Sequence, residues 1–368
     1  MKAYHICHHT DEDGLASAAV IYEYLKIVNK KTEQKSKFFF HKVDYNMELS
    51  SVLPKNIHAE DEFYFVDYSF SKESNLKYLV ELSDKVSNIV WIDHHITSLD
   101  AYYNKEFNIE YNSKIHCYFD EHNSICATQL AYAYAVNSLD TSRIKMGNLD
   151  FITMPKHIPL YIEYVNSWDV WAMNMPNTIE FHHGIEAFKH TPANIFSTIF
   201  KFNSNITSKL FSQNKEDVKI VSTNMKKFID KIIDKGTIIK ECKDLENNAL
   251  CEDKGFEFKL TNEYGETFNC FAVNKRGNST IFGDRINKYD FVIGFEFDGK
   301  QYIYSIYTSK LDYDCSALAY KLGTVDGLGG GGHTQAAGFQ MKHLFIKSNC
   351  RIYIKNKLFG KGYRLVSK

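Results

Sequence analysis

Apolar runs of strand length alternate with amphipathic segments along the first half of the chain. Four such runs end at polar or charged residues, at positions 4–7, 38–40, 63–66 and 89–92. Apolar side chains at helical spacing mark residues 15–25, 76–86, 124–136 and 160–165. Strands that alternate with helices in this way predict a mostly parallel sheet with helices on both faces.

The pattern changes in the second half. Residues 208–240 are rich in Lys and carry apolar side chains at helical spacing, which predicts a connecting helix with one solvated face. Beyond it, three runs are typical of strands, at 268–273, 291–297 and 302–307. Asp298-Gly299 is a hairpin signal between the last two runs, and Asp314 is placed to cap a helix.

These patterns predict an α/β chain with two domains. The expected parts are an α/β domain over 1–205, a helical linker over 206–240 and a smaller mixed α/β domain over 241–368. A length of 368 residues is too long for one ordinary core and also favours two domains.

Composition narrows the class of protein. A net charge of −1 argues against tight, sequence-independent binding of long nucleic acid, which needs many Lys and Arg contacts to phosphates. No segment approaches the roughly 18 apolar residues of a membrane span and no signal-like apolar region follows Met1, so we expect a cytoplasmic protein with no membrane partner. The eight cysteines include no C-x-x-C pair, so neither a zinc knuckle nor a dense disulfide framework is expected.

Acids and histidines gather where the predicted strands stop, which is where open α/β sheets bind ligands. Asp93, His94 and His95 follow the run at 89–92. Neighbouring residues on a strand point to opposite sides, so we expect at most one of the two histidines to face a given metal. The other such residues are His9, Asp11 and Asp13 after the first run, Asp67 after the third, and Asp169 after a helix.

This mixture of ligand types favours particular ions. Carboxylates with one imidazole per ion suit Mn²⁺ or Mg²⁺ better than zinc. A carboxylate that bridges two ions about 3.5–4 Å apart would hold a water in line with a phosphorus atom. Spacing along the chain permits one shared site.

Five motifs, in order, resemble those of the DHH phosphoesterases, the superfamily of nanoRNases and RecJ. His9-Thr10-Asp11-Glu12-Asp13-Gly14 is similar to the first motif, Val66-Asp67 to the second, Asp93-His94-His95 to the third and Trp168-Asp169 to the fourth. Gly329-Gly330-Gly331-Gly332-His333 resembles the GGGH signature of the associated C-terminal domain, and Ala336-Ala337-Gly338-Phe339 follows in pattern. The resemblance covers nearly the whole chain.

The resemblance implies a role for each matching residue. One metal ion would be held by His9, Asp11 and Asp67, and the other by Asp13, Asp67, His94 and Asp169, with Asp67 as the bridge. Asp93 would orient a ligand histidine, and His95 would face the substrate phosphate. Gly330, Gly331, Gly332 and His333 would bind a substrate anion through backbone N–H groups and a side chain.

The chain departs from the family pattern before the glycines. Short-nucleotide members often carry Ser-Leu-Arg-Ser on the preceding strand, whereas residues 305–309 here place Tyr307 at the arginine position. That change removes a bidentate phosphate clamp, and Tyr307 either stacks on a base or packs. Arg276, next to Lys275, is an alternative phosphate contact. His8 and the pair His182-His183 have no place in the motifs and are interpreted as packing or surface residues.

The expected protein is a Mn²⁺-dependent phosphoesterase with two ions, Mg²⁺ being the alternative, and with its active site in the cleft between the domains. Short linear nucleotides are the favoured substrates. A cyclic dinucleotide, a 3′-phosphorylated adenosine nucleotide and an inorganic polyphosphate stay open, as does a non-catalytic nucleotide sensor. No long duplex partner is expected, and a homodimer is left open.

Overall fold

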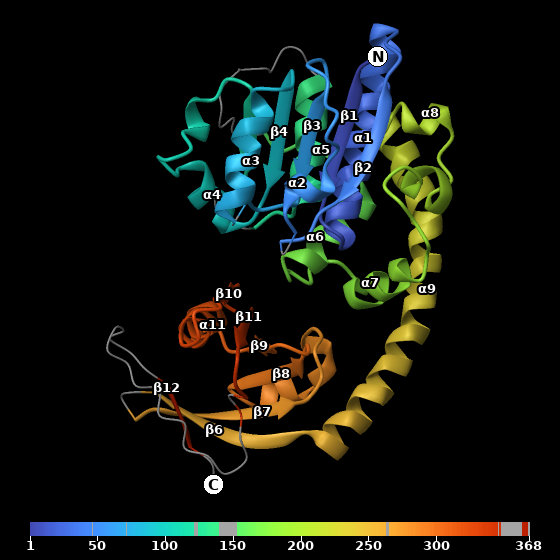
Figure 1. The fold of residues 1–368 in the computed structure, drawn as a ribbon. Coiled ribbons are helices and arrows are strands. Elements are labelled where there is room, and N and C mark those ends of the chain that lie inside the picture. The colour runs from blue at the N-terminus through green and yellow to red at the C-terminus, as the bar shows by residue number, and fades with distance from the viewer. Residues whose placement is uncertain are drawn as a thin grey trace. The chain divides into compact units, whose positions relative to one another are not determined.

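The computed structural model describes residues 1–45, 47–70, 72–120, 124–139, 153–262, 265–344, 346 and 363–366. It divides into two compact units, residues 1–239 and 240–368, each built on one sheet (Figure 1). The α/β class predicted from the sequence is therefore confirmed.

The first unit is built on five parallel strands in the order β2-β1-β3-β4-β5. The strands are β1 (Ala3–His8), β2 (Lys37–Lys42), β3 (Glu62–Val66), β4 (Asn88–Asp93) and β5 (Ile115–Phe119). Because all five run the same way, their carboxyl ends share one edge of the sheet. The strand order reverses between β1 and β3, and ligands in open α/β sheets bind at such a reversal.

Helices cover both faces of this sheet, as predicted (Figure 1). Tyr4 and Ile6 of β1 face a core formed with α1 (Glu12–Thr32), α5 (Ala127–Leu139) and α6 (Leu160–Asp169). The alternate side chains, among them Phe65 and Trp91, face a second core with α3 (Glu73–Ser83) and α4 (Ile96–Tyr102). The inner strands β1, β3 and β4 are buried on both faces, which explains why their sequences read as continuous apolar runs.

The last helix of the first unit, α9 (Lys215–Lys254), continues into the second. Val221, Met225, Ile229 and Ile232 lie on one side of it and are buried in the first core, so the amphipathic pattern is realised. The helix begins later and ends later than the linker expected at 206–240; the finer division of the chain stays a prediction. Among the described residues, no helix is both long and apolar enough to cross a bilayer.

Shorter elements complete the first unit. They are α2 (Leu49–Val52), α7 (Thr178–Glu186), α8 (Ser204–Thr207), the 3-10 helix η1 (Ile109–Tyr111) and the π-helix η2 (Ile195–Ile199).

The second unit has a mixed seven-stranded sheet in the order β10-β11-β9-β8-β7-β6-β12, in which only β7 and β8 pair in parallel. A tight hairpin at Asp298 and Gly299 joins β8 to β9, and Asp314 caps α11 by accepting a hydrogen bond from the amide of Ala317, both as predicted. Its elements are β6 (Phe256–Asn262), β7 (Thr267–Val273), η3 (Ser279–Phe282), α10 (Arg285–Lys288), β8 (Phe291–Phe297), β9 (Tyr302–Tyr307), α11 (Cys315–Thr324), β10 (Gly330–Gly332), β11 (Ala336–Met341) and β12 (Tyr363–Val366).

Two neighbouring histidines on β1 and β2 make the first unit sensitive to acid. His5 is buried, stacks on Phe63 at 4.3 Å between ring centroids, and its Nδ1 lies 2.9 Å from Nε2 of His41. Burial lowers the pKa of both rings, and the charge of His5 lowers that of His41 further, to about 4. An unfolded histidine binds its proton near pH 6.5, so the stabilisation is complete above that pH and is lost as the pH falls.

We therefore predict that part of the free energy of unfolding lost between pH 7 and pH 5 depends on His41. His41→Gln removes the titrating ring and should reduce that loss by about 1 kcal/mol, allowing for partial solvent screening. Urea unfolding of both proteins at several pH values measures it. Parallel pH profiles for the two proteins would show that the pair does not control acid stability.

Candidate active site

A carboxylate follows each of the five strands at the carboxyl edge of the first sheet. These residues are Asp44 after β2, Asp11 after β1, Asp67 after β3, Asp93 at the end of β4 and Asp120 after β5. The parallel topology thus places acids that are far apart in the sequence at one edge of the sheet, and three of them, Asp11, Asp67 and Asp93, belong to groups of potential ligands.

The first motif is fixed by the beginning of α1. Asp11 caps this helix, with Oδ1 accepting a hydrogen bond from the amide of Gly14 at 3.0 Å, while Oδ2 lies 2.7 Å from Nδ1 of His9. A Cβ atom on Gly14 would lie 2.4 Å from the carbonyl oxygen of His9, so only glycine fits there. The carboxylate of Asp13 accepts hydrogen bonds from the backbone amides of Ala127 and Thr128 at the start of α5, both at 2.8 Å.

Asp67 lies at the centre of the cluster and has a strained backbone. Its φ of 53° is in the left-handed region, which is rare for residues other than glycine and is typical of functional sites. Its side chain is only 2% exposed. Oδ1 lies 3.6 Å from Nε2 of His94, and Oδ2 lies 3.8 Å from Nδ1 of His9.

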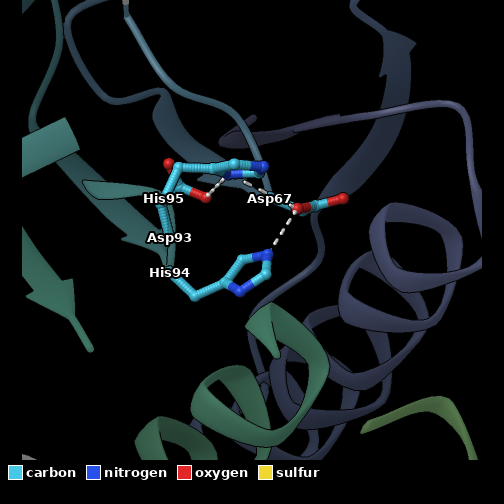
Figure 2. Close-up of side chains that lie close together, drawn as sticks. All are labelled: Asp67, Asp93, His94 and His95. Carbon is cyan, nitrogen blue, oxygen red and sulfur yellow. Dashed lines mark hydrogen bonds and ion pairs between the residues drawn. The ribbon is translucent and has the colours of Figure 1, made fainter. Parts of the chain in front are cut away.

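Both histidines of the third motif converge on Asp67 (Figure 2). Nδ1 of His95 lies 4.0 Å from Oδ1 of Asp67, and the His94 and His95 rings are 4.5 Å apart. The expectation that they point to opposite sides is wrong, because β4 ends at Asp93 and strand alternation no longer applies beyond it.

Asp93 orients His95. Its Oδ1 lies 2.8 Å from Nδ1 of His95, and its Oδ2 accepts a hydrogen bond from the hydroxyl of Ser98. Burial alone would lower the pKa of His95, but the Asp93 carboxylate raises it to about 9. The resemblance implied that Asp93 orients a metal-binding histidine. In the structure, Asp93 contacts His95 instead. Nδ1 of His94 is buried without a hydrogen-bond partner among the described residues.

Two three-residue groups of potential metal ligands form around Asp67. Asp169, the last residue of α6, places Oδ2 3.4 Å from Nε2 of His94. In each group the ligand atoms all lie within 4.8 Å of one another. The groups are His9, Asp11 and Asp67, and Asp13, His94 and Asp169. The first group coincides with the set that the resemblance implies for one ion, whereas the second lacks Asp67, whose Oδ1 lies 3.6 Å from Nε2 of His94. A further group of four, Asp67, Asp93, His94 and His95, places both histidines of the third motif within reach of one ion, contrary to the expectation.

The electrostatics of the cluster fit a cation. Burial, followed by the charges of the neighbouring acids, raises the pKa of Asp67 and of Asp169 well above the usual range. Among the described residues, Oδ2 of each is buried without a hydrogen-bond partner. A buried carboxylate that lacks a partner is costly, and carboxylate-rich ligand sets suit hard divalent ions. These residues could therefore hold a metal ion.

Sequence reasoning missed Tyr45, Ser98 and the partners of Glu12. The hydroxyl of Tyr45 lies 3.2 Å from Nε2 of His95. Tyr45 follows β2, so the strand-end rule that found the acids would also have found it. Glu12, inside the first motif, accepts hydrogen bonds from the Tyr161 hydroxyl at 2.6 Å and His190 Nε2 at 3.0 Å; nothing local in the sequence signals those distant partners.

The histidines left out of the motifs differ in their surroundings. His8 is buried with Nδ1 2.7 Å from the carbonyl oxygen of His9, and it belongs to none of the ligand groups in the described residues. His182 stacks on Trp168 with ring centroids 3.7 Å apart, at the edge of a pocket of about 80 Å³ that Asp11, Asp13 and Asp169 also line. Glu186 lies 3.6 Å from both His182 and His183, and the three side chains form a further group of potential metal ligands that the interpretation as packing or surface residues did not foresee.

The glycine signature lies in the second unit and is a strand. Gly330, Gly331 and Gly332 form β10, which pairs antiparallel with β11 at the edge of the sheet, so the expected glycine loop is corrected to an edge strand. On an edge strand, alternate N–H groups face away from the partner and stay available to a ligand. His333 is exposed immediately after this strand.

The two other predicted substrate contacts of the second unit differ in accessibility. The hydroxyl of Tyr307 donates a hydrogen bond to the carbonyl oxygen of Gly277 at 2.6 Å, and its ring packs near Phe282. Arg276 is exposed. Because its hydroxyl is already hydrogen-bonded, Tyr307 could contact a substrate only through its ring, whereas the guanidinium of Arg276 is accessible.

Comparisons with known proteins do not assign the chain to a family. No family model matches it, and no curated protein matches it by sequence. Similar solved structures include an uncharacterized protein from Helicobacter pylori G27, with 15% identity, 94% of each chain covered and a TM-score of 0.33. A pGpG-specific phosphodiesterase, PggH from Vibrio cholerae, has 12% identity, covers 92% of this chain and 93% of its own, and has a TM-score of 0.40.

RecJ from Thermus thermophilus, solved with Mn²⁺, has 12% identity, and the match covers 92% of this chain and 49% of RecJ with a TM-score of 0.45. Such low identities and scores leave the function to be inferred from the residues of this chain.

The charge on Asp67 should destabilise the metal-free protein. Asp67→Asn removes that charge, keeps the side-chain size and tolerates a left-handed backbone. Because the folded-state pKa of Asp67 is raised, its ionisation costs stability as the pH rises. We expect the metal-free variant to exceed the wild type by about 1–3 kcal/mol in free energy of unfolding at pH 7.5, with a smaller difference at pH 4.5.

Urea unfolding in EDTA measures this difference, and thermal unfolding with Mn²⁺ provides the complementary test. The ion should raise the Tm of the wild type and leave that of Asp67→Asn nearly unchanged. A variant that is less stable than the wild type without metal, or that gains as much from Mn²⁺, would show that the cluster does not require a cation at Asp67.

Proposed function

We propose that the protein is a DHH-type phosphoesterase that hydrolyses phosphodiester bonds of short nucleotides with two Mn²⁺ ions. The observation that carries this proposal is the buried carboxylate of Asp67, which has an oxygen without a hydrogen-bond partner among the described residues. Asp67 belongs to one group of potential ligands, and its Oδ1 lies 3.6 Å from Nε2 of His94 in the other. A binding module that only recognises a nucleotide has no use for such a carboxylate, so hydrolysis is favoured over sensing.

The residues that would hold the ions are those of the two groups. His9 and Asp11 would hold one ion, and Asp13, His94 and Asp169 the other, with Asp67 shared. When bound, two such ions polarise the phosphoryl oxygens and favour ionisation of a water molecule near neutral pH. Asp67 is suited to the bridging place because the hydrogen bond from its amide to the carbonyl oxygen of Ile92, at 3.0 Å, and the surrounding core fix its backbone.

His95 is proposed to act on the substrate. Asp93 holds Nδ1, so Nε2, which also lies 3.2 Å from the Tyr45 hydroxyl, is the ring nitrogen directed at a phosphoryl oxygen. The raised pKa of about 9 favours a charged ring at neutral pH. A charged donor to an oxygen that gains negative charge in the transition state lowers the barrier to hydrolysis.

The second unit is proposed to bind a further phosphate of the substrate. The N–H groups of β10, the side chain of His333 and the exposed guanidinium of Arg276 offer donors to an anion. A short nucleotide has such a second phosphate, whereas a small generic diester does not. This requirement is why we favour oligonucleotides of a few residues as the substrates.

The proposed chemistry is tested by turnover with and without Mn²⁺. Wild-type protein should hydrolyse a linear dinucleotide only with the ion, and Asp67→Asn should lose about a thousandfold in kcat, as expected for removal of a main electrostatic stabiliser. Asp120→Asn, at the end of β5 and outside the ligand groups, is the matched control and should keep its rate. Equal rates for wild type and Asp67→Asn, or hydrolysis that survives EDTA, would exclude this mechanism.

Substrate length provides a separate prediction. Oligonucleotides of two to five residues should be cut faster than a 20-mer, and His333→Ala should raise KM for them while hydrolysis of bis-p-nitrophenyl phosphate changes little, because remote contacts help only substrates that reach them. A length series under excess Mn²⁺, with a cyclic dinucleotide and a 3′,5′-bisphosphate as competitors, measures this. Rates that increase with length would instead favour an exonuclease, and equal impairment on every substrate would point to a structural role for His333.

A further inference from the structure

Tyr45 occupies a place that links the two halves of the candidate site. Its ring centroid lies 4.8 Å from that of His9, which belongs to one ligand group, and its hydroxyl lies 3.2 Å from Nε2 of His95. Tyr68 stacks on Tyr45 at 5.8 Å, with 11° between the ring planes. The segment after β2 thus reaches the site formed by β1, β3 and β4.

The hydrogen bonds of His95 explain why this contact matters. An imidazole has two nitrogens, and Asp93 occupies Nδ1. Nε2, the atom that the proposed function directs at a phosphoryl oxygen, is the atom that Tyr45 contacts. The ring is therefore held at both nitrogens, so rotation about the Cβ–Cγ bond would break both contacts.

The Tyr45 hydroxyl lies within hydrogen-bond reach of Nε2 of His95. A hydroxyl offers one donor and two acceptor positions, so the contact with His95 leaves capacity for another partner. A phosphoryl oxygen that approaches Nε2 therefore meets an imidazole whose orientation Asp93 and Tyr45 already fix.

We propose that Tyr45 is a positioning residue that fixes the imidazole of His95 for contact with the substrate phosphoryl group. The expected effect of Tyr45 on turnover rests on the proposed function, whereas the contact between the Tyr45 hydroxyl and Nε2 of His95 can be tested without any substrate. A tyrosine that only packs would tolerate loss of its hydroxyl, because the ring contacts with His9 and Tyr68 remain in phenylalanine.

Tyr68 provides a matched control. It is buried and stacked on Tyr45, but its hydroxyl accepts a hydrogen bond from Nδ2 of Asn75 at 2.9 Å, and neither residue belongs to a ligand group in the described part of the chain. Tyr68→Phe therefore removes a hydroxyl from the same aromatic stack without touching His95.

The first experiment is ¹⁵N NMR of the histidine side chains in metal-free protein. Tyr45→Phe should shift the Nε2 resonance of His95, whereas Tyr68→Phe should leave it in place. Circular dichroism and Tm confirm that both variants fold. An unchanged His95 resonance in folded Tyr45→Phe would overturn the proposal, whatever the protein hydrolyses.

The second experiment is a double-mutant cycle on a dinucleotide with Mn²⁺. Tyr45→Phe should lower kcat about three- to tenfold, the change that corresponds to one hydrogen bond, with KM nearly constant. In a His95→Ala background the same substitution should have no further effect, because Tyr45 acts through His95. An equal loss in both backgrounds would contradict this role. If the wild type hydrolyses nothing, the proposed function fails and the NMR result alone decides whether Tyr45 holds His95.

Discussion

The burial of the Asp67 carboxylate among other carboxylates is the main electrostatic constraint on the candidate site of the first unit. Without a cation, a buried acid surrounded by like charges is unfavourable, and the raised pKa values of Asp67 and Asp169 express that cost. The strands nevertheless keep Asp67 in this place. Its backbone is in the left-handed conformation, and its amide donates a hydrogen bond to the carbonyl oxygen of Ile92 on β4. Without a cation, a neutral residue of the same shape, such as Asn, would be more favourable there, and the cluster could therefore hold a metal ion.

The parallel sheet supplies the geometry for this site. Three of the residues lie at the ends of three different strands: His9 after β1, Asp67 after β3 and Asp93 at the end of β4. These ends share one edge of the sheet, at the point where the strand order reverses between β1 and β3. Asp11 and Asp13 also belong to the beginning of α1, and Asp13 accepts the amides at the start of α5. The same contacts that start these helices orient the carboxylates, which couples folding of the helices to assembly of the site.

Much of this arrangement could be predicted from the sequence. Apolar runs identified four of the five strands in the first sheet, and the strand-end rule together with the motifs identified the residues that gather around Asp67. β5 was not predicted, because Ile115-His116-Cys117-Tyr118-Phe119 mixes polar and apolar residues without a clear period. The directions of His94 and His95, the partner of Asp93 and the role of Tyr45 depend on where β4 ends and on contacts across strands, which no local pattern reports. The glycines were expected to form a loop because strand pairing with β11 leaves no mark on a run of glycine.

Electron paramagnetic resonance of the protein titrated with Mn²⁺ tests the central claim most directly. Two ions that share the Asp67 carboxylate would be spin-coupled, so the spectrum should change from that of free Mn²⁺ to that of a coupled pair at about two ions per chain. A spectrum of isolated ions at all ratios, or no binding, would contradict the account of Asp67 as a bridge between two metal ions.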